Sequence, residues 1–145
     1  MATLLADVPP DFLRVLAVAF GLIWGSFINV VIYRLPRGMS VARPASHCPA
    51  CGEPIPVYRN VPIVSWALQR GKAACCGAKV SPRYLLVELA GGALSLAILE
   101  VAVLTLPGST TLLHAVMIYL ADFALVLGLL AAAFIDLEHM IIPDS

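Results

Sequence analysis

Three long apolar runs dominate the pattern of hydrophobic and polar positions along the chain. They cover residues 12–33, 84–106 and 112–135. Each run is long enough for a helix to cross a bilayer, which takes about 20 residues. The second and third runs are joined by a short segment with Pro107 and Gly108, which are typical turn residues. The pattern therefore predicts an all-α integral membrane protein with about three transmembrane helices.

The segment between the first two runs has a different character. Residues 34–83 contain all four cysteines and all but one of the lysines and arginines. A segment of this size buries little core by itself, so we expect a small loop domain that depends on a metal or on the membrane surface. The predicted units are residues 1–33, with an N-terminal lead and the first helix, residues 34–83, the basic cysteine-containing loop, and residues 84–145, with the other two helices.

The distribution of positive charge predicts the orientation in the membrane. Lysine and arginine collect in cytoplasmic loops, so residues 34–83 should face the cytoplasm and the N-terminus should lie outside. The third helix then brings Asp136 back to the cytoplasmic side. Acidic residues precede the first run, and the run is too long for the apolar part of a signal peptide, so we expect it to be retained.

Composition agrees with a membrane setting. The chain is 61% hydrophobic and 12% charged, whereas an ordinary soluble domain is about half apolar and about a quarter charged. The lipid bilayer is therefore the first expected partner. The formal net charge is +0, so composition offers no support for nucleic-acid binding.

The four cysteines occur as two closely spaced pairs. Cys48 and Cys51 flank a Pro-Ala dipeptide, whereas Cys75 and Cys76 are adjacent. Two facing pairs of thiolates form the tetrahedral zinc site of a zinc ribbon, and a cytoplasmic loop disfavours disulfides. The expected ligands are Cys48, Cys51 and Cys76, with Cys75, His47 or water as the fourth. Two alternatives stay open: a knuckle with free thiols held by packing, and a redox dithiol at the first pair.

Several polar residues interrupt the apolar runs, where an ionisable group is costly and calls for a partner. Glu88 lies near the loop end of the second run, and we expect Arg83 or Arg34 to pair with it. Asn29 and Gly25 belong to a small polar patch on the first run. Close helix packing and contact with a ligand are both open for that patch.

Four further polar positions carry weaker expectations. Arg14 and Glu100 should reach the membrane interface at the outer end. Asp122 lies deep in the third run, where a polar contact with another helix and a functional role are equally open. His139 shares a face with Asp136 if the third helix continues that far, and could orient it.

Six short motifs follow one another from residue 25 almost to the last residue. They are GSFINVVIYRLP at 25–36, CPAC at 48–51, YRNVPIVSW at 58–66, RGK at 70–72, VSPRYLLVEL at 80–89 and IDLEHMIIPD at 135–144. In this order and spacing the motifs resemble the N-terminal portion of the type IV prepilin leader peptidase and N-methyltransferase family.

The resemblance implies a multi-pass aspartic enzyme of the bacterial inner membrane. Such an enzyme cleaves the leaders of type IV prepilins or pseudopilins and methylates the new N-terminus with S-adenosylmethionine. Asp136 would be one catalytic carboxylate. Glu88, Asn29 and Asp144 become candidates for contact with substrate or methyl donor, and Zn²⁺ would be held by the four cysteines.

Two departures from the family pattern change these expectations. Ala73 stands where the second cysteine pair of the family begins, so Cys75 and Cys76 form an altered pair. The sequence also contains no Gly-x-Gly-Asp motif, which carries the second catalytic aspartate. Aspartic peptidases need two carboxylates that share a proton, and Asp122 lies about 21 Å from Asp136 along an ideal helix. We therefore expect the chain alone to be inactive and to need a C-terminal half as its partner.

Two readings without catalysis compete with the enzyme. One is a truncated remnant that keeps the membrane scaffold and perhaps the metal. The other is a zinc-ribbon membrane adaptor unrelated to pilins. The adaptor reading predicts that pilin processing does not depend on Asp136.

Overall fold

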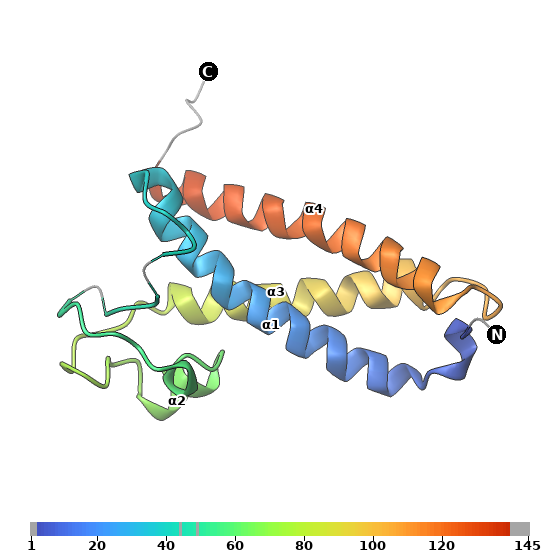
Figure 1. The fold of residues 1–145 in the computed structure, drawn as a ribbon, viewed down its shortest axis with the longest axis horizontal. Coiled ribbons are helices and arrows are strands. Elements are labelled where there is room, and N and C mark those ends of the chain that lie inside the picture. The colour runs from blue at the N-terminus through green and yellow to red at the C-terminus, as the bar shows by residue number, and fades with distance from the viewer. Residues whose placement is uncertain (1–2, 44, 49, 140–145) are drawn as a thin grey trace, which may run out of the picture.

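Three long helices lie side by side, and an irregular segment with one short helix occupies one end of the bundle (Figure 1). The computed structural model describes residues 3–43, 45–48 and 50–139. The long helices are α1 (Pro10–Arg34), α3 (Arg83–Ile98) and α4 (Leu112–His139), and α2 (Val64–Leu68) belongs to the irregular segment. Shorter turns are η1 (Leu5–Asp7), η2 (Leu35–Arg37), η3 (Val57–Arg59) and the π-helical η4 (Leu99–Val103).

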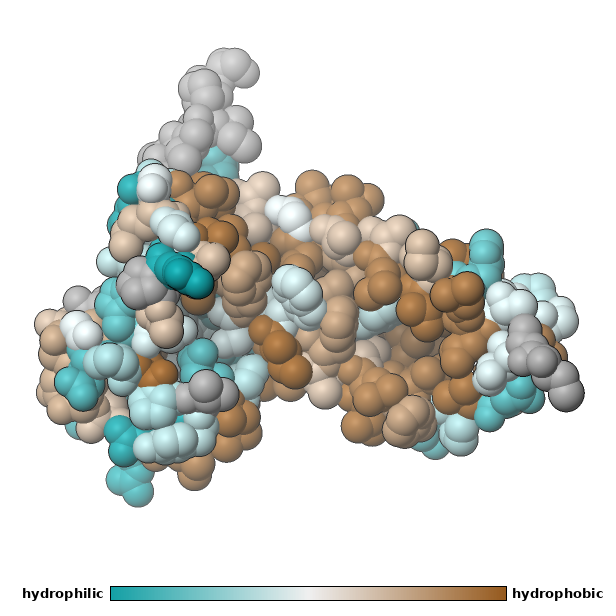
Figure 2. Space-filling model, viewed as in Figure 1, coloured by the Kyte–Doolittle hydropathy of each residue, from teal (hydrophilic) through white to brown (hydrophobic). Residues whose placement is uncertain are grey.

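The prediction of an all-α architecture is confirmed for the part of the chain that the structure describes. That part holds isolated bridges but no strand. Three helical stretches are long and apolar enough to cross a membrane, namely Pro10–Arg37, Arg83–Val103 and Leu112–Glu138. Figure 2 shows apolar side chains along the bundle, with hydrophilic residues collected toward its two ends. Large apolar residues remain exposed on α4, and in a bilayer these would contact lipid.

Two helix boundaries differ from those predicted. The second span passes from α3 into the π-helical turn η4 before the chain reverses. The third helix extends beyond residue 135, so that Asp136 lies on α4 rather than just after a helix end. The sequence after residue 135 contains no proline before Pro143, and an ion pair between Glu138 and Arg83 joins the end of α4 to the start of α3.

Helices α1 and α3 approach each other closely because glycines meet at their crossing. A Cβ atom added to Gly21 would lie 2.4 Å from the carbonyl oxygen of Gly91, and one added to Gly25 would lie 2.9 Å from the Cα of Glu88. Small residues of this kind allow backbone contact between membrane helices, where packing rather than hydrophobic exclusion drives association. For Gly25, close packing is therefore observed.

The bundle has two apolar clusters with a polar contact between them. Leu5, Leu99 and Val103 belong to the cluster near the turn after η4, and Ile32 and Val87 to the cluster near the irregular segment. Between them, the Ser95 hydroxyl lies 2.5 Å from both the carbonyl oxygen of Ala17 and the hydroxyl of Tyr119. This contact satisfies the hydroxyl of Ser95, which is fully buried.

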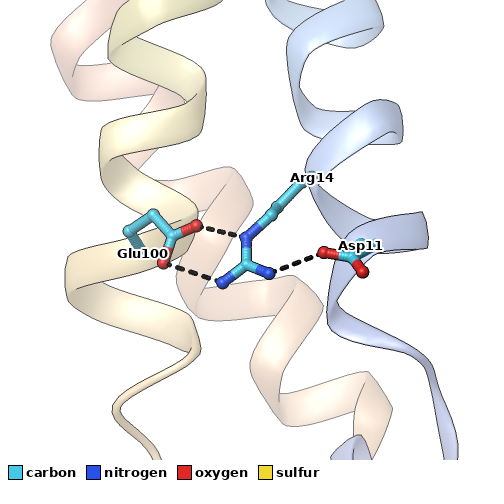
Figure 3. A network of polar contacts seen from close by, with 3 residues as sticks. All are labelled: Asp11, Arg14 and Glu100. Atoms are coloured by element: carbon cyan, nitrogen blue, oxygen red, sulfur yellow. Dashed lines mark hydrogen bonds and ion pairs between the residues drawn. The ribbon is translucent and has the colours of Figure 1, made fainter.

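The end of the bundle near the N-terminus holds a network of three charges (Figure 3). The Arg14 guanidinium donates to Glu100 over 2.6 Å and to Asp11 over 2.8 Å. Arg14 and Glu100 were predicted to reach the interface separately, but they pair with each other. The N-terminal lead also packs against the turn after η4, since the Leu5 N–H donates to the Thr110 carbonyl over 2.9 Å.

Candidate functional site

The four cysteines come together within the irregular segment between α1 and α3. Their sulfur atoms all lie within 4.8 Å of one another. The Sγ atoms of Cys48 and Cys76 are 3.8 Å apart, and those of Cys51 and Cys75 are 3.3 Å apart. Zinc bonds to thiolates of about 2.3 Å in tetrahedral geometry separate the sulfurs by about 3.8 Å. The cluster therefore fits a single zinc ion, and all four cysteines are free thiols.

Two backbone turns of similar design position the cysteines. In the first, the Gly52 N–H donates to the Cys48 carbonyl over 2.8 Å, and Gly52 has a φ of 76°. In the second, the Gly77 N–H donates to the Ala73 carbonyl over 2.7 Å, and Gly77 has a φ of 72°. Glycine takes this left-handed conformation without steric cost. The second turn places both adjacent cysteines in the cluster.

The fourth member of the cluster is Cys75, which was one of three alternatives. His47 is not a member; its Nδ1 lies 3.2 Å from the Ala45 carbonyl. Ala73, at the position where the family pattern has a cysteine, instead contributes backbone hydrogen bonds that close the second turn.

The thiols of the cluster have very different acidities. Backbone N–H groups of Cys51 and Ala50 stabilise the thiolate and lower the pKa of Cys48 to about 6. A hydrogen bond with Cys51, assisted by burial, raises the pKa of Cys75 to about 12. Cys48 is therefore largely a thiolate at neutral pH, whereas Cys75 keeps its proton. A bound metal would have to displace that proton.

A cavity of about 850 Å³ lies between the irregular segment and the adjoining parts of α1 and α3. Ligand sites in proteins commonly have volumes of about 300–1,000 Å³. Asn29 and Glu88, both predicted as substrate or cofactor contacts, line this cavity, and so do the four cysteines. The structure therefore brings these two candidate residues and the cysteine cluster to one place.

Asn29 links the two helices that form one wall of the cavity. It is 2% exposed, and its Nδ2 donates to the Tyr84 carbonyl over 3.0 Å. A weaker contact of 3.4 Å reaches the Gly25 carbonyl within α1. The other amide atom, Oδ1, is buried and accepts no hydrogen bond from a described residue, which costs about 1–3 kcal/mol.

The predicted partners of Glu88 were wrong. The Glu88 Oε2 accepts a hydrogen bond of 2.7 Å from the backbone N–H of Ile63. Arg83 pairs instead with Glu138 on α4, and the Arg34 guanidinium donates to the carbonyls of Ser40 and Ala45. Arg34 thus bonds to backbone carbonyls of the segment that follows α1, and Arg83 pairs with a residue of α4.

Ile63 and Trp66 were not identified from the sequence. Ile63 has a φ of 62°, which is strained for a β-branched residue, and this conformation directs its N–H to Glu88. Trp66, one turn later on α2, has a buried Nε1 without a described acceptor. The single tryptophan of segment 34–83 was the only signal in the sequence for either residue. The pattern of side chains gives no information about a backbone donor such as the Ile63 N–H.

Asp136 lies apart from this cavity. It is half-buried on α4 and is not among the residues that line the cavity in the described part of the chain. Asp122 lies on the same helix, about 21 Å away by helical rise, so the structure does not bring these two carboxylates together. Helix α4 does reach His139, as its predicted place beside Asp136 requires. Asp144 lies outside the described residues.

Comparisons with known proteins point to one family. Residues 19–102 match the model of the bacterial peptidase A24 N-terminal domain. A prepilin leader peptidase/N-methyltransferase of Myxococcus xanthus is 42% identical over 125 residues, which cover 86% of this chain and 34% of that relative. A protein of the same description from Klebsiella pneumoniae is 39% identical over 131 residues, covering 86% of this chain and 53% of the relative.

A third relative, the type 4 prepilin-like proteins leader peptide-processing enzyme of Escherichia coli, is 40% identical over 153 residues, covering 93% of this chain and 53% of the relative. The chain thus spans about a third to a half of the length of these curated relatives. The search of solved structures found no significant match. The three relatives are 39–42% identical to this chain over most of its length, and the chain belongs to the bacterial A24 family of prepilin leader peptidases and N-methyltransferases.

Proposed function

We propose that this chain forms the N-terminal portion of an aspartic enzyme that cleaves the leader from type IV prepilins or pseudopilins and then methylates the new N-terminus. The observation that carries the proposal is the family match over residues 19–102, together with its relatives described as prepilin leader peptidase/N-methyltransferase. A cavity and a cysteine cluster inside the matched region support it.

Asp136 supplies one of the two peptidase carboxylates in this proposal. A dyad needs a second acid close enough to share a proton, so that one group activates water and the other protonates the peptide carbonyl. Asp122 is too distant on the same helix to serve. Because the relatives are two to three times as long as the region matched, we assign the second carboxylate to their additional C-terminal half.

The proposed orientation places the irregular segment and Asp136 in or at the cytoplasm and the N-terminus outside. The basic residues of segment 34–83 support it through the positive-inside rule. The end of α4 that carries Asp136 is tied to the start of α3 by the Arg83–Glu138 ion pair. In this proposal the end of α4 and the start of α3 therefore both lie at the cytoplasmic face of the membrane, where the precursors are made.

Zn²⁺ and S-adenosylmethionine are the proposed cofactors. Cys48, Cys51, Cys75 and Cys76 would hold the zinc, whose part is to fix the fold of the irregular segment. The cavity beside this cluster would receive the methyl donor or the peptide N-terminus. Asp144 stays a candidate contact from the sequence alone.

A cleavage assay tests the proposed peptidase. The chain, joined to or mixed with a C-terminal half from a relative, is given a prepilin, and leader release is followed by gel shift or mass spectrometry. The variant Asp136→Asn should lower the rate by about a hundredfold or more, because an amide cannot exchange the proton. Asp122→Asn, on the same helix, is the matched control and should process normally.

Two results would contradict the proposed peptidase. One is normal processing by Asp136→Asn, which would favour a zinc-ribbon adaptor or a remnant. The other is an equal loss in both variants, which would indicate damage to α4 rather than removal of a catalytic group.

A further inference from the structure

Two buried side chains beside the cavity have unused capacity to accept hydrogen bonds. Asn29 Oδ1 accepts none from the described residues. Glu88 is 8% exposed, and its only hydrogen bond within the described chain comes from the Ile63 N–H. No lysine, arginine or histidine among the described residues lies within 4.0 Å of this carboxylate. A buried carboxylate ordinarily requires a cation or several donors.

The two residues that carry these acceptors are close neighbours on facing helices. Asn29 donates to the Tyr84 carbonyl, one turn before Glu88 on α3, and Gly25, one turn before Asn29, contacts Glu88 directly. Trp66 lines the same cavity from α2 and has a buried Nε1–H with no described acceptor. Residues of three elements that line one cavity thus carry two acceptors and one donor with unused hydrogen-bonding capacity.

We propose that this cavity binds an α-ammonium group together with the carbonyl beside it, the ammonium on Glu88 and Asn29 Oδ1 and the carbonyl on Trp66 Nε1–H. An ammonium has three donors and a positive charge, which match the carboxylate and the free amide oxygen. The adjacent carbonyl or carboxylate oxygen matches the indole donor.

Four basic residues also line the cavity, namely Arg34, Arg59, Lys72 and Lys79. The Arg34 guanidinium is buried and donates to the carbonyls of Ser40 and Ala45, whereas the other three side chains are exposed. Among the described residues, none of these cations forms an ion pair with Glu88. An anion would be repelled by Glu88 at the helix wall, whereas an ammonium at the same place meets opposite charge.

Two ligands share the recognised group, and their identity rests on the proposed function. N-methylation transfers a methyl group from S-adenosylmethionine to a peptide N-terminus, which releases S-adenosylhomocysteine and a proton. Both reactants contain an α-ammonium on the carbon atom that is bonded to a carboxylate or carbonyl carbon. The geometry recognises that group in either source.

Binding measurements on the purified chain in dodecyl maltoside, which carries no amine, distinguish the two sources. The first arm compares S-adenosylmethionine with methylthioadenosine, which lacks the amino-acid part. The second compares a short apolar peptide with its N-acetylated form. We expect the ammonium-bearing member of at least one pair to bind about tenfold or more tightly. The pair that shows this preference identifies the source.

Three variants should reduce that preference. Glu88→Gln and Asn29→Leu should each lower the affinity for the ammonium-bearing ligand about tenfold and leave the affinity for its partner unchanged. Trp66→Phe keeps the ring and removes the donor, so it should weaken binding by a smaller factor. The matched control is Glu100→Gln, an acid on the same span at the other end of the bundle. Melting temperature and zinc content identify a variant that has merely unfolded.

The proposal is overturned if neither pair shows a preference, or if the preference survives in Glu88→Gln and Asn29→Leu. Either result would mean that these acceptors serve another part of the enzyme. Leader cleavage that depends on Asp136 would still support the proposed function in that case, because the two tests use separate groups and separate readouts.

Discussion

The two ends of the bundle accommodate a glutamate of the second span in different ways. Each carries a glutamate of the second span at the border of the membrane. Glu100 is paired with Arg14, which also contacts Asp11, so its charge is balanced by side chains of the chain itself. Glu88 is more deeply buried and receives a single backbone N–H. The comparison teaches that the first acid completes a structural contact, whereas the second retains capacity for another group.

The largest expected effect comes from separating the helices that place both glutamates. Gly21→Val puts a side chain where a Cβ already meets the Gly91 carbonyl at 2.4 Å, and a backbone atom cannot rotate away. We expect a loss of about 1–3 kcal/mol in stability or more, measured as thermal unfolding in detergent. Gly128→Val is the control, since nothing lies within 4 Å of an added Cβ there. Equal melting temperatures would show that α1 and α3 do not pack as described.

Metal removal should affect only the end that contains Glu88. A chelator, or the variant Cys48→Ser, should release zinc and make segment 34–83 sensitive to protease, because so small a segment lacks a core. The contact between Arg14 and Glu100 should be unaffected. Protection that persists without metal would show that packing alone holds the cysteine turns.

The same cluster predicts the direction of the pH dependence. Zinc binds thiolates, so affinity should fall as pH decreases, and it should fall more steeply below about pH 6, where Cys48 also becomes protonated. Above that pH, binding should still release protons, since Cys75 has a pKa of about 12 and must lose its proton to become a ligand. Calorimetry in buffers of different ionisation enthalpy measures this release. Zinc affinity independent of pH between 5 and 7 would argue against a thiolate site.

The smallest effect is expected at the paired end. Arg14→Gln and Glu100→Gln should each lower the melting temperature slightly, because both side chains are partly exposed. The double variant should be no less stable than the worse single variant, as the two residues share one contact. If the losses in melting temperature add in the double variant, Arg14 and Glu100 are not coupled. In that case Glu100 would not be balanced by a partner, and the two ends would no longer differ in this respect.

The helices could be predicted from the sequence because each apolar run is long and nearly free of charge. The cysteine-containing loop could be recognised between the first two apolar runs from its composition, and the resemblance to the family followed from ordered motifs. The partner of Glu88 was missed because a sequence shows which side chains carry charge, so Arg83 and Arg34 were the visible choices. The actual donor is the backbone of Ile63, in a conformation that side-chain preferences disfavour.

The cysteine site was only partly predictable for a related reason. Adjacent Cys75 and Cys76 suggested that one of them would point away from a shared ion. Whether both can join depends on the local path of the chain, which is closed by Gly77 and by a bridge between Lys72 and Lys79. The glycine after each pair marks a turn in the sequence, but whether both adjacent side chains reach one point depends on the backbone hydrogen bonds of the folded turn.

The ion pair between Arg83 and Glu138 has a mechanical consequence. Arg83 is the last residue of the cysteine-containing segment and the first of α3, and Glu138 lies two positions beyond Asp136. A displacement of that segment would stretch this ion pair unless the tip of α4 moved with it. While the pair holds, any group that shifts the segment would therefore also shift the helix end that carries Asp136.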